Sequence, residues 1–150
     1  MEVNGFENYL IYPSGKVYSK KSKRYLNPYC NSHGYLNVNL YKDGKKKIYK
    51  IHRLVGLYYI PNPDNKICLD HIDRNRKNNK LNNLRWATYS ENNQNTGVRK
   101  DNTSGIKNIS YHKTNDRYDY RKMIRSVKHH KVFRTLEEAI QYKTIFENNI

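Results

Sequence analysis

Hydrophobic and polar residues alternate in short runs along the first third of the chain, and turn sequences separate the runs. In GYLNVNLYKDG, Leu36, Val38 and Leu40 occupy every second position, so a strand would place them on one face and the intervening asparagines on the other. The Asp-Gly pair that follows suits a tight hairpin turn, and Lys45 begins the expected return strand. The pattern predicts a module of small β-hairpins over residues 1–50.

A helical period replaces this alternation at Ile51. Ile51, Leu54, Val55 and Tyr58 recur at i, i+3, i+4 and i+7, and prolines follow in IPNP, so we expect a short helix. His52 lies next to the apolar face of this helix. A packing or capping role is favoured for it over a catalytic role.

The central stretch LDHIDRNRKNNKLNNLRWATYSENNQN contains two short apolar runs on either side of a basic, asparagine-rich loop. ICLDHI predicts a first strand, and LRWAT predicts a second strand that buries Leu84 and Trp86. Ser90 is the expected N-cap of a short helix that ends at Gly97. The predicted order is therefore strand, loop, strand and helix.

A stretch without hydrophobic periodicity, TGVRKDNTSG, predicts a linker over residues 98–105. A separate module follows over residues 106–150. Its helix opens at Thr135, with Glu138 as the capping-box partner. Its three expected strands cover residues 106–111, 118–127 and 131–133.

The charge balance indicates the class of partner. The chain carries 29 lysine and arginine residues against 13 aspartate and glutamate residues, a net charge of +16, and the excess is spread along the whole length. Double-stranded DNA is the expected partner. RNA is an alternative, because the 15 tyrosines could stack on unpaired bases. An A·T-rich genome would also enrich tyrosine, lysine, asparagine and isoleucine, which hints at a viral source.

Several classes of protein and site are disfavoured. Cys30 and Cys68 lack a second cysteine two residues away, so a structural zinc site of that kind is not expected and the thiols should be reduced. No apolar run approaches the roughly 18 residues that span a bilayer, and the N-terminus does not resemble a signal peptide. We expect a soluble intracellular protein, in the host-cell cytoplasm or nucleoid if it is viral, with no membrane partner and no small-molecule substrate.

Asp70 and His71 stand side by side where the first central strand gives way to the loop. Successive side chains leave a strand on opposite faces, but both can border one cleft if the strand ends here. A neutral histidine suits the activation of water, and the oxygen atoms of Asp70 and Asn92 suit Mg²⁺ or Mn²⁺. These residue types fit the hydrolysis of a phosphodiester bond.

The pieces IHRLV, IPNP, DHID, LNNLRWAT and SENNQN occur in an order and at a spacing that resemble the HNH endonuclease family, in its branch of phage and viral homing endonucleases. The resemblance covers residues 51–95. It implies a ββα-metal core in which His71 is the general base and Asn83 pins the loop. Asp70 and Asn92 would hold one divalent metal ion, Mg²⁺ or Mn²⁺.

Asn92 stands where many HNH enzymes carry their final histidine. An amide holds a metal less tightly than an imidazole does, so the resemblance implies weaker metal affinity and tolerance of several divalent ions. Asn93 would replace Asn92 as the ligand if the helix began one residue later.

Both flanking segments resemble DNA-binding modules. The N-terminal hairpins are similar to modules fused ahead of such nucleases, and residues 104–148 are similar to the sheet-plus-helix domain of plant ethylene-response factors, whose sheet lies in the major groove. Tyr118 or Tyr120 stands where that family has tryptophan, and Lys131-Val132 replaces its glycine. The implied DNA contacts are Lys113, Arg117, Arg121, Arg125 and Lys128, together with the loop residues Arg74, Arg76, Lys77 and Lys80, which a solvated charge run would explain equally well.

Taken together, the patterns predict an α+β chain. Its parts are a small β-hairpin module (1–50), an HNH ββα-metal core (51–97), a linker (98–105) and a C-terminal three-stranded antiparallel sheet plus helix (106–150). The hypothesis for function is a metal-dependent HNH DNA endonuclease of the homing type, acting as a monomer because nothing resembles a dimerisation helix. The alternative is a non-catalytic, repressor-like DNA-binding protein with a degenerate nuclease motif. The intact set of Asp70, His71, Asn83 and Asn92 favours catalysis.

Overall fold

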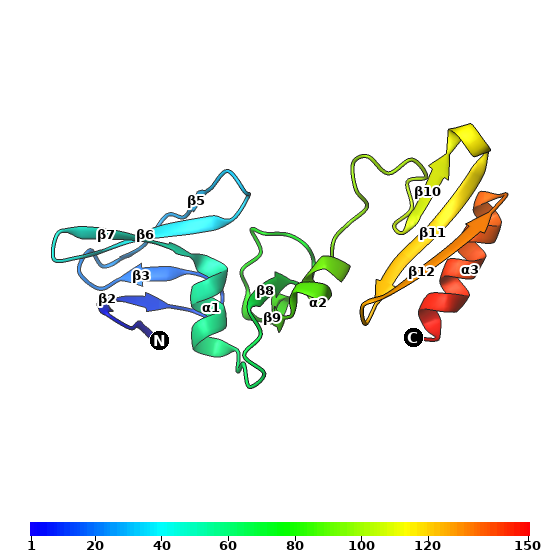
Figure 1. Cartoon of the computed structure of the whole chain (residues 1–150). Helices are drawn as coiled ribbons and strands as arrows, with labels where there is room; N and C mark the ends of the chain where they lie inside the picture. Colours follow the sequence, from blue (N-terminus) through cyan, green and yellow to red (C-terminus); the bar gives the residue numbers. More distant parts are fainter. The chain divides into compact units, whose positions relative to one another are not determined.

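The computed structural model describes residues 1–150, which form two compact units, Met1–Thr96 and Gly97–Ile150 (Figure 1). Both units combine small antiparallel sheets with few helices, so the α+β prediction is confirmed. None of the three α-helices has the length and apolar character that crossing a bilayer would require.

Two small sheets open the first unit. The first, in the order β1-β2-β3-β4, contains Glu2–Val3, Phe6–Ile11, Val17–Ser19 and Arg24–Tyr25, and the second, in the order β5-β6-β7, contains Tyr29–Cys30, Leu36–Lys42 and Lys45–Lys50. Strands β6 and β7 form the predicted hairpin around the Asp43-Gly44 turn, in which both residues have a positive φ.

Helix α1 (Ile51–Tyr59) follows directly, and its apolar face is buried as the helical period predicted. Two antiparallel strands come next, β8 (Cys68–His71) and β9 (Leu84–Ala87), with the short 3-10 turn η1 (Leu81–Asn83) before β9. Helix α2 (Tyr89–Gln94) completes the predicted order of strand, loop, strand and helix.

One hydrophobic core joins the N-terminal sheets to the central hairpin. Ile11 of β2, Leu40 of β6 and apolar residues of α1 are buried together with Leu69 of β8 and Leu84 of β9. The boundary predicted at residue 50 falls inside this core. A separate DNA-contacting role for the N-terminal hairpins therefore stays a prediction.

Gly56 brings α1 close to β8, the strand that carries Asp70 and His71. A Cβ at this position would lie 2.4 Å from Cδ2 of Leu69, which is itself buried. Overpacking of this kind lowers the free energy of unfolding by up to about 3 kcal/mol, and the better helix propensity of alanine offsets about 1 kcal/mol of this loss. Gly56→Ala is therefore expected to lower the free energy of unfolding by about 2 kcal/mol, measured by urea denaturation.

The control for this prediction is Leu57→Ala, one residue further along the same helix, where the side chain is 67% exposed. It should change the free energy of unfolding by less than about 0.5 kcal/mol. If Gly56→Ala were as stable as the wild type, Leu69 would move aside without cost. That result would contradict the expectation that the contact between α1 and β8 is too tight for a Cβ.

The N-cap of α2 is Thr88, so the prediction of Ser90 is wrong. Thr88 Oγ1 accepts the Glu91 N–H at 3.2 Å, and the Glu91 carboxylate accepts the Thr88 N–H at 2.6 Å. Thr88 has a glutamate three positions later and Ser90 does not, so only Thr88 can form this capping box. The helix also ends at Gln94 rather than at Gly97.

The second unit is a three-stranded antiparallel sheet with a helix along one face (Figure 1). Its elements are β10 (Ile109–His112), the 3-10 turn η2 (Lys113–Asn115), β11 (Arg117–Ile124), β12 (Val127–Phe133) and α3 (Leu136–Asn148). Ile109, Tyr120 and Ala139 form the buried core of this unit. Thr135 and Glu138 form the predicted capping box at the start of α3.

Three strand boundaries in this unit differ from the prediction by three residues or more. Strand β11 ends at Ile124 rather than at Val127. Strand β10 begins at Ile109 rather than at Ile106, because a turn closed by the Ile109 N–H on the Ile106 carbonyl at 3.1 Å precedes it. Strand β12 begins at Val127 rather than at Lys131. Arg125 and Ser126 both have a positive φ and make the two-residue turn that starts β12 early.

Part of the segment predicted as a linker is bound to the second unit. The side chains of Asn102 and Ser104 donate to the Ile109 carbonyl at 2.6 and 2.7 Å, and that of Thr103 donates to the Tyr111 carbonyl at 2.8 Å. Short polar side chains thus satisfy the free carbonyl groups of β10. Residues 102–104 belong to the folded unit rather than to a free connection.

Candidate active site

Asp70 of β8 is a buried carboxylate with two strong hydrogen-bond donors beside it. Arg85 lies opposite in the β8–β9 ladder and donates to Oδ2 from Nε at 3.1 Å and from Nη2 at 3.0 Å. Asn95, just after α2, donates from Nδ2 to both carboxylate oxygens, at 3.0 and 2.9 Å. The carboxylate is therefore well paired although only 8% of the side chain is exposed.

The Asn95 amide nitrogen occupies a point on which three oxygen atoms converge. Besides the two Asp70 oxygens, it donates to the His71 carbonyl oxygen at 2.8 Å. Carboxylate and carbonyl oxygens are the ligands that hard divalent cations prefer. No group of three or more His, Cys, Asp or Glu side chains in the protein is arranged to hold a metal ion, so a cation here would rely on these oxygens, an amide oxygen and water. The residues fit a hard divalent ion.

Asn92, the predicted second metal ligand, does not contact Asp70. It is half-buried in α2 three residues before Asn95, so the two asparagines lie on one side of the helix. The Asn92 side chain has no hydrogen-bond partner in the protein. Asn93 is exposed and lies on another side of α2. The assignment of Asn92 as a ligand stays a prediction.

His71 is the last residue of β8, and its ring is buried. Nε2 lies 2.9 Å from Oδ1 of Asn79, and the ring centre is 5.0 Å from that of His52 and 6.1 Å from that of Tyr35. The strand therefore ends where the sequence predicted. The Asp70 and His71 side chains have different partners, and Asn95 links the Asp70 carboxylate to the His71 carbonyl.

His52 of α1 is buried against the rings of Tyr35 and His71, in line with the predicted packing role. Its burial is the largest cause that lowers its pKa, to about 3, and the nearby charges of His71, Arg53 and Lys50 act in the same direction. The imidazole of His52 is therefore neutral at physiological pH.

Acid should destabilise the first unit through His52. The ordinary pKa is 6.5, so between pH 6.5 and about 3 the unfolded chain binds a proton that the folded chain excludes. As the pH falls below 6.5, His52 is expected to lower the free energy of unfolding by up to about 1.4 kcal/mol per pH unit. Urea denaturation at several pH values measures this slope. His52→Phe keeps the buried ring without titrating and should make the slope shallower, and an unchanged slope would contradict the prediction.

Asn83, the predicted loop clamp, ties together the base of the loop between β8 and β9. Its side chain accepts the Asp73 N–H at 3.0 Å and donates to the Asp73 carboxylate and the Asn78 carbonyl, both at 2.8 Å. Hydrogen bonds from the Asn78 side chain, the Asn75 backbone and Asn83 outweigh burial and lower the pKa of Asp73. The charged carboxylate is a strong acceptor, so these bonds hold the loop.

The four basic residues of this loop that were predicted to contact DNA are all exposed. They are Arg74, Arg76, Lys77 and Lys80. The Arg76 guanidinium has two contacts: Cζ lies over the Tyr35 ring at 4.9 Å, and Nη1 donates to the His33 carbonyl at 2.7 Å. The loop therefore presents positive charge beside the buried Asp70 and His71.

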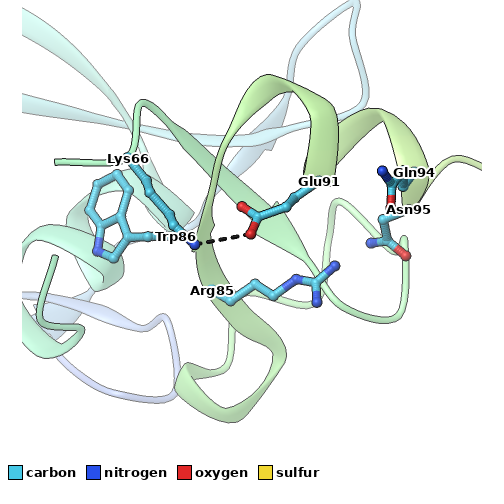
Figure 2. Close-up of a pocket in the computed structure, with 6 residues that line it drawn as sticks. All are labelled: Lys66, Arg85, Trp86, Glu91, Gln94 and Asn95. Atoms are coloured by element: carbon cyan, nitrogen blue, oxygen red, sulfur yellow. Dashed lines mark hydrogen bonds and ion pairs between the residues drawn. The ribbon is translucent and has the colours of Figure 1, made fainter. Parts of the chain in front are cut away.

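A pocket of about 390 Å³ lies against the residues that hold Asp70 (Figure 2). Its lining consists of Lys66, Arg85, Trp86, Glu91, Gln94 and Asn95. Lys66 and Glu91 pair with each other at 3.1 Å, whereas Arg85 and Asn95 both donate to Asp70. The Asp70 carboxylate is thus close to open space on the side of α2.

In the second unit, Arg117, Asp119 and Arg121 alternate with the core residues of β11 and lie on the sheet face opposite α3. Asp119 is fully buried among cationic groups, with Arg121 Nη2 at 2.6 Å and Arg117 Nε at 3.2 Å from its oxygens. His130 and His112 lie at 3.2 and 3.3 Å. Burial raises the pKa of Asp119, but these four neighbours outweigh it and hold the pKa below its ordinary value.

The predicted DNA contacts of the second unit do not all share this face. Lys128 pairs with Met123 in the ladder and lies on the same face as Arg121. Arg125 lies in the turn between β11 and β12, and Lys113 lies in η2. The sheet therefore aligns three of the five residues and leaves two at its ends.

Three residues that shape the site were missed in the sequence: Asn79, Arg85 and Asn95. Alternation along LRWAT predicts that Arg85 faces away from Leu84 and Trp86, but only the strand register shows that it meets Asp70. Asn79 and Asn95 belong to stretches with many asparagines, and no local signal distinguishes them from their neighbours.

Comparison with known proteins identifies relatives of the central part of the chain. Residues 49–94 match the family model of HNH endonucleases. The DNA endonuclease I-HmuI of Bacillus phage SP01 is 36% identical over 95 residues, which cover 63% of this chain and 55% of that protein. The H-N-H endonuclease F-TflII of Escherichia phage T5 is 34% identical over 108 residues, 71% of this chain and 56% of that protein.

An uncharacterised HNH endonuclease of Acanthamoeba polyphaga mimivirus, L245, is 44% identical over 85 residues, 57% of this chain and 26% of that protein. The chain thus spans between about a quarter and a little over half of the length of these relatives. All three relatives are viral proteins, in line with the viral source at which the amino-acid composition hints.

A solved structure resembles most of the chain. It is that of the HNH homing endonuclease I-HmuI, in work on DNA binding and cleavage by that protein. The match has a TM-score of 0.60 at 28% identity and covers 94% of this chain and 80% of the other.

Proposed function

Because residues 49–94 match the family model of HNH endonucleases, we propose that this chain is a DNA endonuclease of the homing type that depends on a divalent metal ion. The observation that carries the proposal is that both Asp70 oxygens and the His71 carbonyl oxygen converge on one point, while the side chain of the same His71 is a buried imidazole whose Nδ1 is free of protein partners. Hydrolysis of a phosphodiester requires a base and a cation side by side.

Asp70 and Asn92 are the proposed metal ligands, and Mg²⁺ or Mn²⁺ is the proposed ion. When bound, such an ion would polarise the phosphodiester and stabilise the charge that develops on it. The amide nitrogen of Asn95 must leave the Asp70 oxygens before a cation can reach them. Asn92 lies on the same side of α2 with a free amide, and can supply an oxygen without adding negative charge.

The remaining side chains of the site position the reactants. His71 takes the proton from the attacking water. Asn83 clamps the loop, and Arg85 places a positive charge beside Asp70. The exposed cations of the loop contact the DNA phosphates. These cations are Arg74, Arg76, Lys77 and Lys80.

Double-stranded DNA is the proposed partner of the second unit as well. Asp119 holds Arg117 and Arg121 in place on the sheet face opposite α3, and arginine can pair bidentately with guanine edges. Lys113, Arg125 and Lys128 would contact the backbone phosphates. Such contacts release counterions, so DNA affinity should fall steeply as salt increases.

The test of this proposal incubates the purified chain with host genomic DNA in Mg²⁺, in Mn²⁺ or in chelator, and maps new DNA ends by sequencing. A mobility-shift assay measures binding to the same DNA. Metal-dependent ends at a recurrent position support a homing endonuclease. Binding without new ends, on DNA that carries the bound site, would overturn the proposal in favour of a repressor-like protein.

A further inference from the structure

The His71 ring has one hydrogen bond within the protein, and it involves only one of the two ring nitrogens. Nε2 lies 2.9 Å from Oδ1 of Asn79, inside the protein. Nδ1 has no partner, yet it is not sealed from solvent as Nδ1 of His52 is. The two nitrogens of His71 therefore have different environments.

The hydrogen bond to Asn79 determines where the proton of a neutral His71 resides. A neutral imidazole carries one N–H, on either nitrogen, and an amide oxygen can only accept a hydrogen bond. With Oδ1 of Asn79 beside Nε2, the proton is on Nε2 and the lone pair is on Nδ1. The nitrogen that can accept a proton is then the one that water can reach.

Asn79 is itself held from two sides. It is buried, and the preceding residue, Asn78, receives a hydrogen bond from the Asn83 side chain on its carbonyl oxygen at 2.8 Å. On the other side, Gly15 lies so close that a Cβ there would be 3.0 Å from both Cβ and the carbonyl oxygen of Asn79. The Pro13 carbonyl also accepts the Leu81 N–H at 2.8 Å. The turn between β2 and β3 thus closes over Asn79.

We propose that Asn79, braced by the turn at residues 13–15, is a positioning residue that holds His71 in the Nε2–H tautomer. The inference rests on the proposed function for its effect on cleavage, where His71 must offer Nδ1 to the attacking water. The tautomer itself is a property of the folded chain without metal or DNA. The N-terminal hairpins therefore take part in organising the base.

The direct test is nitrogen NMR on the full chain with ¹⁵N-labelled histidine, in the absence of metal and at mildly alkaline pH, where an ordinary imidazole is neutral. The pair of ring-nitrogen signals that is missing from the spectrum of His71→Gln is assigned to His71. We expect a protonated Nε2 and an unprotonated Nδ1. A proton on Nδ1, or a mixture of both tautomers, would overturn the proposal whether or not the protein cleaves DNA.

Variants of Asn79 test the cause. Asn79→Ala removes the acceptor and should give a mixture of tautomers, whereas Asn79→Asp keeps an acceptor oxygen and should restore the Nε2–H form. The matched control is Ile72→Ala in the same loop, because the Ile72 side chain is 47% exposed and, as an apolar group, hydrogen-bonds to neither Asn79 nor the Asp73 clamp. If Asn79→Ala kept the wild-type tautomer, the rest of the fold and not this hydrogen bond would determine the tautomer of His71. That result would overturn the role of Asn79.

Single-turnover cleavage shows the consequence. Asn79→Ala is expected to slow cleavage by about 10–100-fold, the usual effect of losing a group that orients a functional side chain, with DNA affinity unchanged. Asn79→Asp should recover most of the rate, and Ile72→Ala should retain it. A wild-type rate in Asn79→Ala, or no recovery in Asn79→Asp despite a restored tautomer, would contradict the link to catalysis. Absence of cleavage by the wild type would instead count against the proposed function and leave the NMR result to decide the tautomer.

Discussion

Replacing His71 with alanine is expected to slow DNA cleavage by about 10²–10⁴-fold, because this is the usual contribution of a positioned general base. No neighbouring side chain can take over the role. His52 has the nearest imidazole, but its Nδ1 is buried. Burial also lowers the pKa of His52 to about 3, so this ring is a poor acceptor for the proton of a water molecule. Single-turnover cleavage at saturating Mn²⁺, on the DNA site identified by end mapping, measures the effect.

The control for this experiment is His33→Ala, since His33 is exposed and only its backbone carbonyl binds Arg76. Its cleavage rate should equal that of the wild type. His71 is buried, so His71→Gln, which keeps polar atoms and much of the volume, serves if the alanine variant unfolds. DNA affinity should be unchanged in all three variants. Cleavage by folded His71 variants at the wild-type rate would remove His71 from the mechanism.

The second large effect is expected in α2, where two asparagines should respond in opposite directions. Asn92→Ala removes a proposed metal ligand and should weaken Mn²⁺ binding and cleavage by at least about 100-fold, since even groups that only orient ligands cost 10–100-fold. Asn95→Ala removes the amide nitrogen that competes with a cation for the Asp70 oxygens. Its Mn²⁺ affinity should therefore equal or exceed that of the wild type.

Isothermal titration calorimetry with Mn²⁺ on the full chain measures both effects without DNA. Asn93→Ala is the matched control, because Asn93 is exposed on another side of the same helix and should not alter metal affinity. Thermal unfolding of each variant shows whether α2 remains in place. If Asn95→Ala lost metal binding and Asn92→Ala kept it, Asn95 would be the ligand and the assignment of Asn92 would be wrong.

The elements that sequence patterns predicted well depend on residues close together in the chain. The β6–β7 hairpin follows from alternation and an Asp-Gly turn, α1 from its helical period, and the start of α3 from Thr135 and Glu138. The start of α2 was missed although Thr88 and Glu91 form the same type of capping box. Serine is the more favourable N-cap residue by itself, but Ser90 has no glutamate three positions later.

The residues of the site also fall into those that local sequence indicates and those that only the fold brings together. The chemistry of a nuclease was enough to select Asp70, His71 and Asn92 as candidates, because it restricts which residue types can serve as base and ligand, and the resemblance to HNH endonucleases added Asn83. Residue type and spacing also indicated a polyanionic partner. These inferences need only the identity of residues and their position along the chain.

Tertiary structure decided which side chains meet. Arg85 reaches Asp70 through the register of two strands, and Gly15 closes over Asn79 from a different part of the chain. Asn95, rather than Asn92, contacts Asp70 because of where α2 begins and ends. Such contacts change with a shift of one residue, which rotates a helix by about 100° or turns a strand over, and no local pattern in the sequence specifies them that finely.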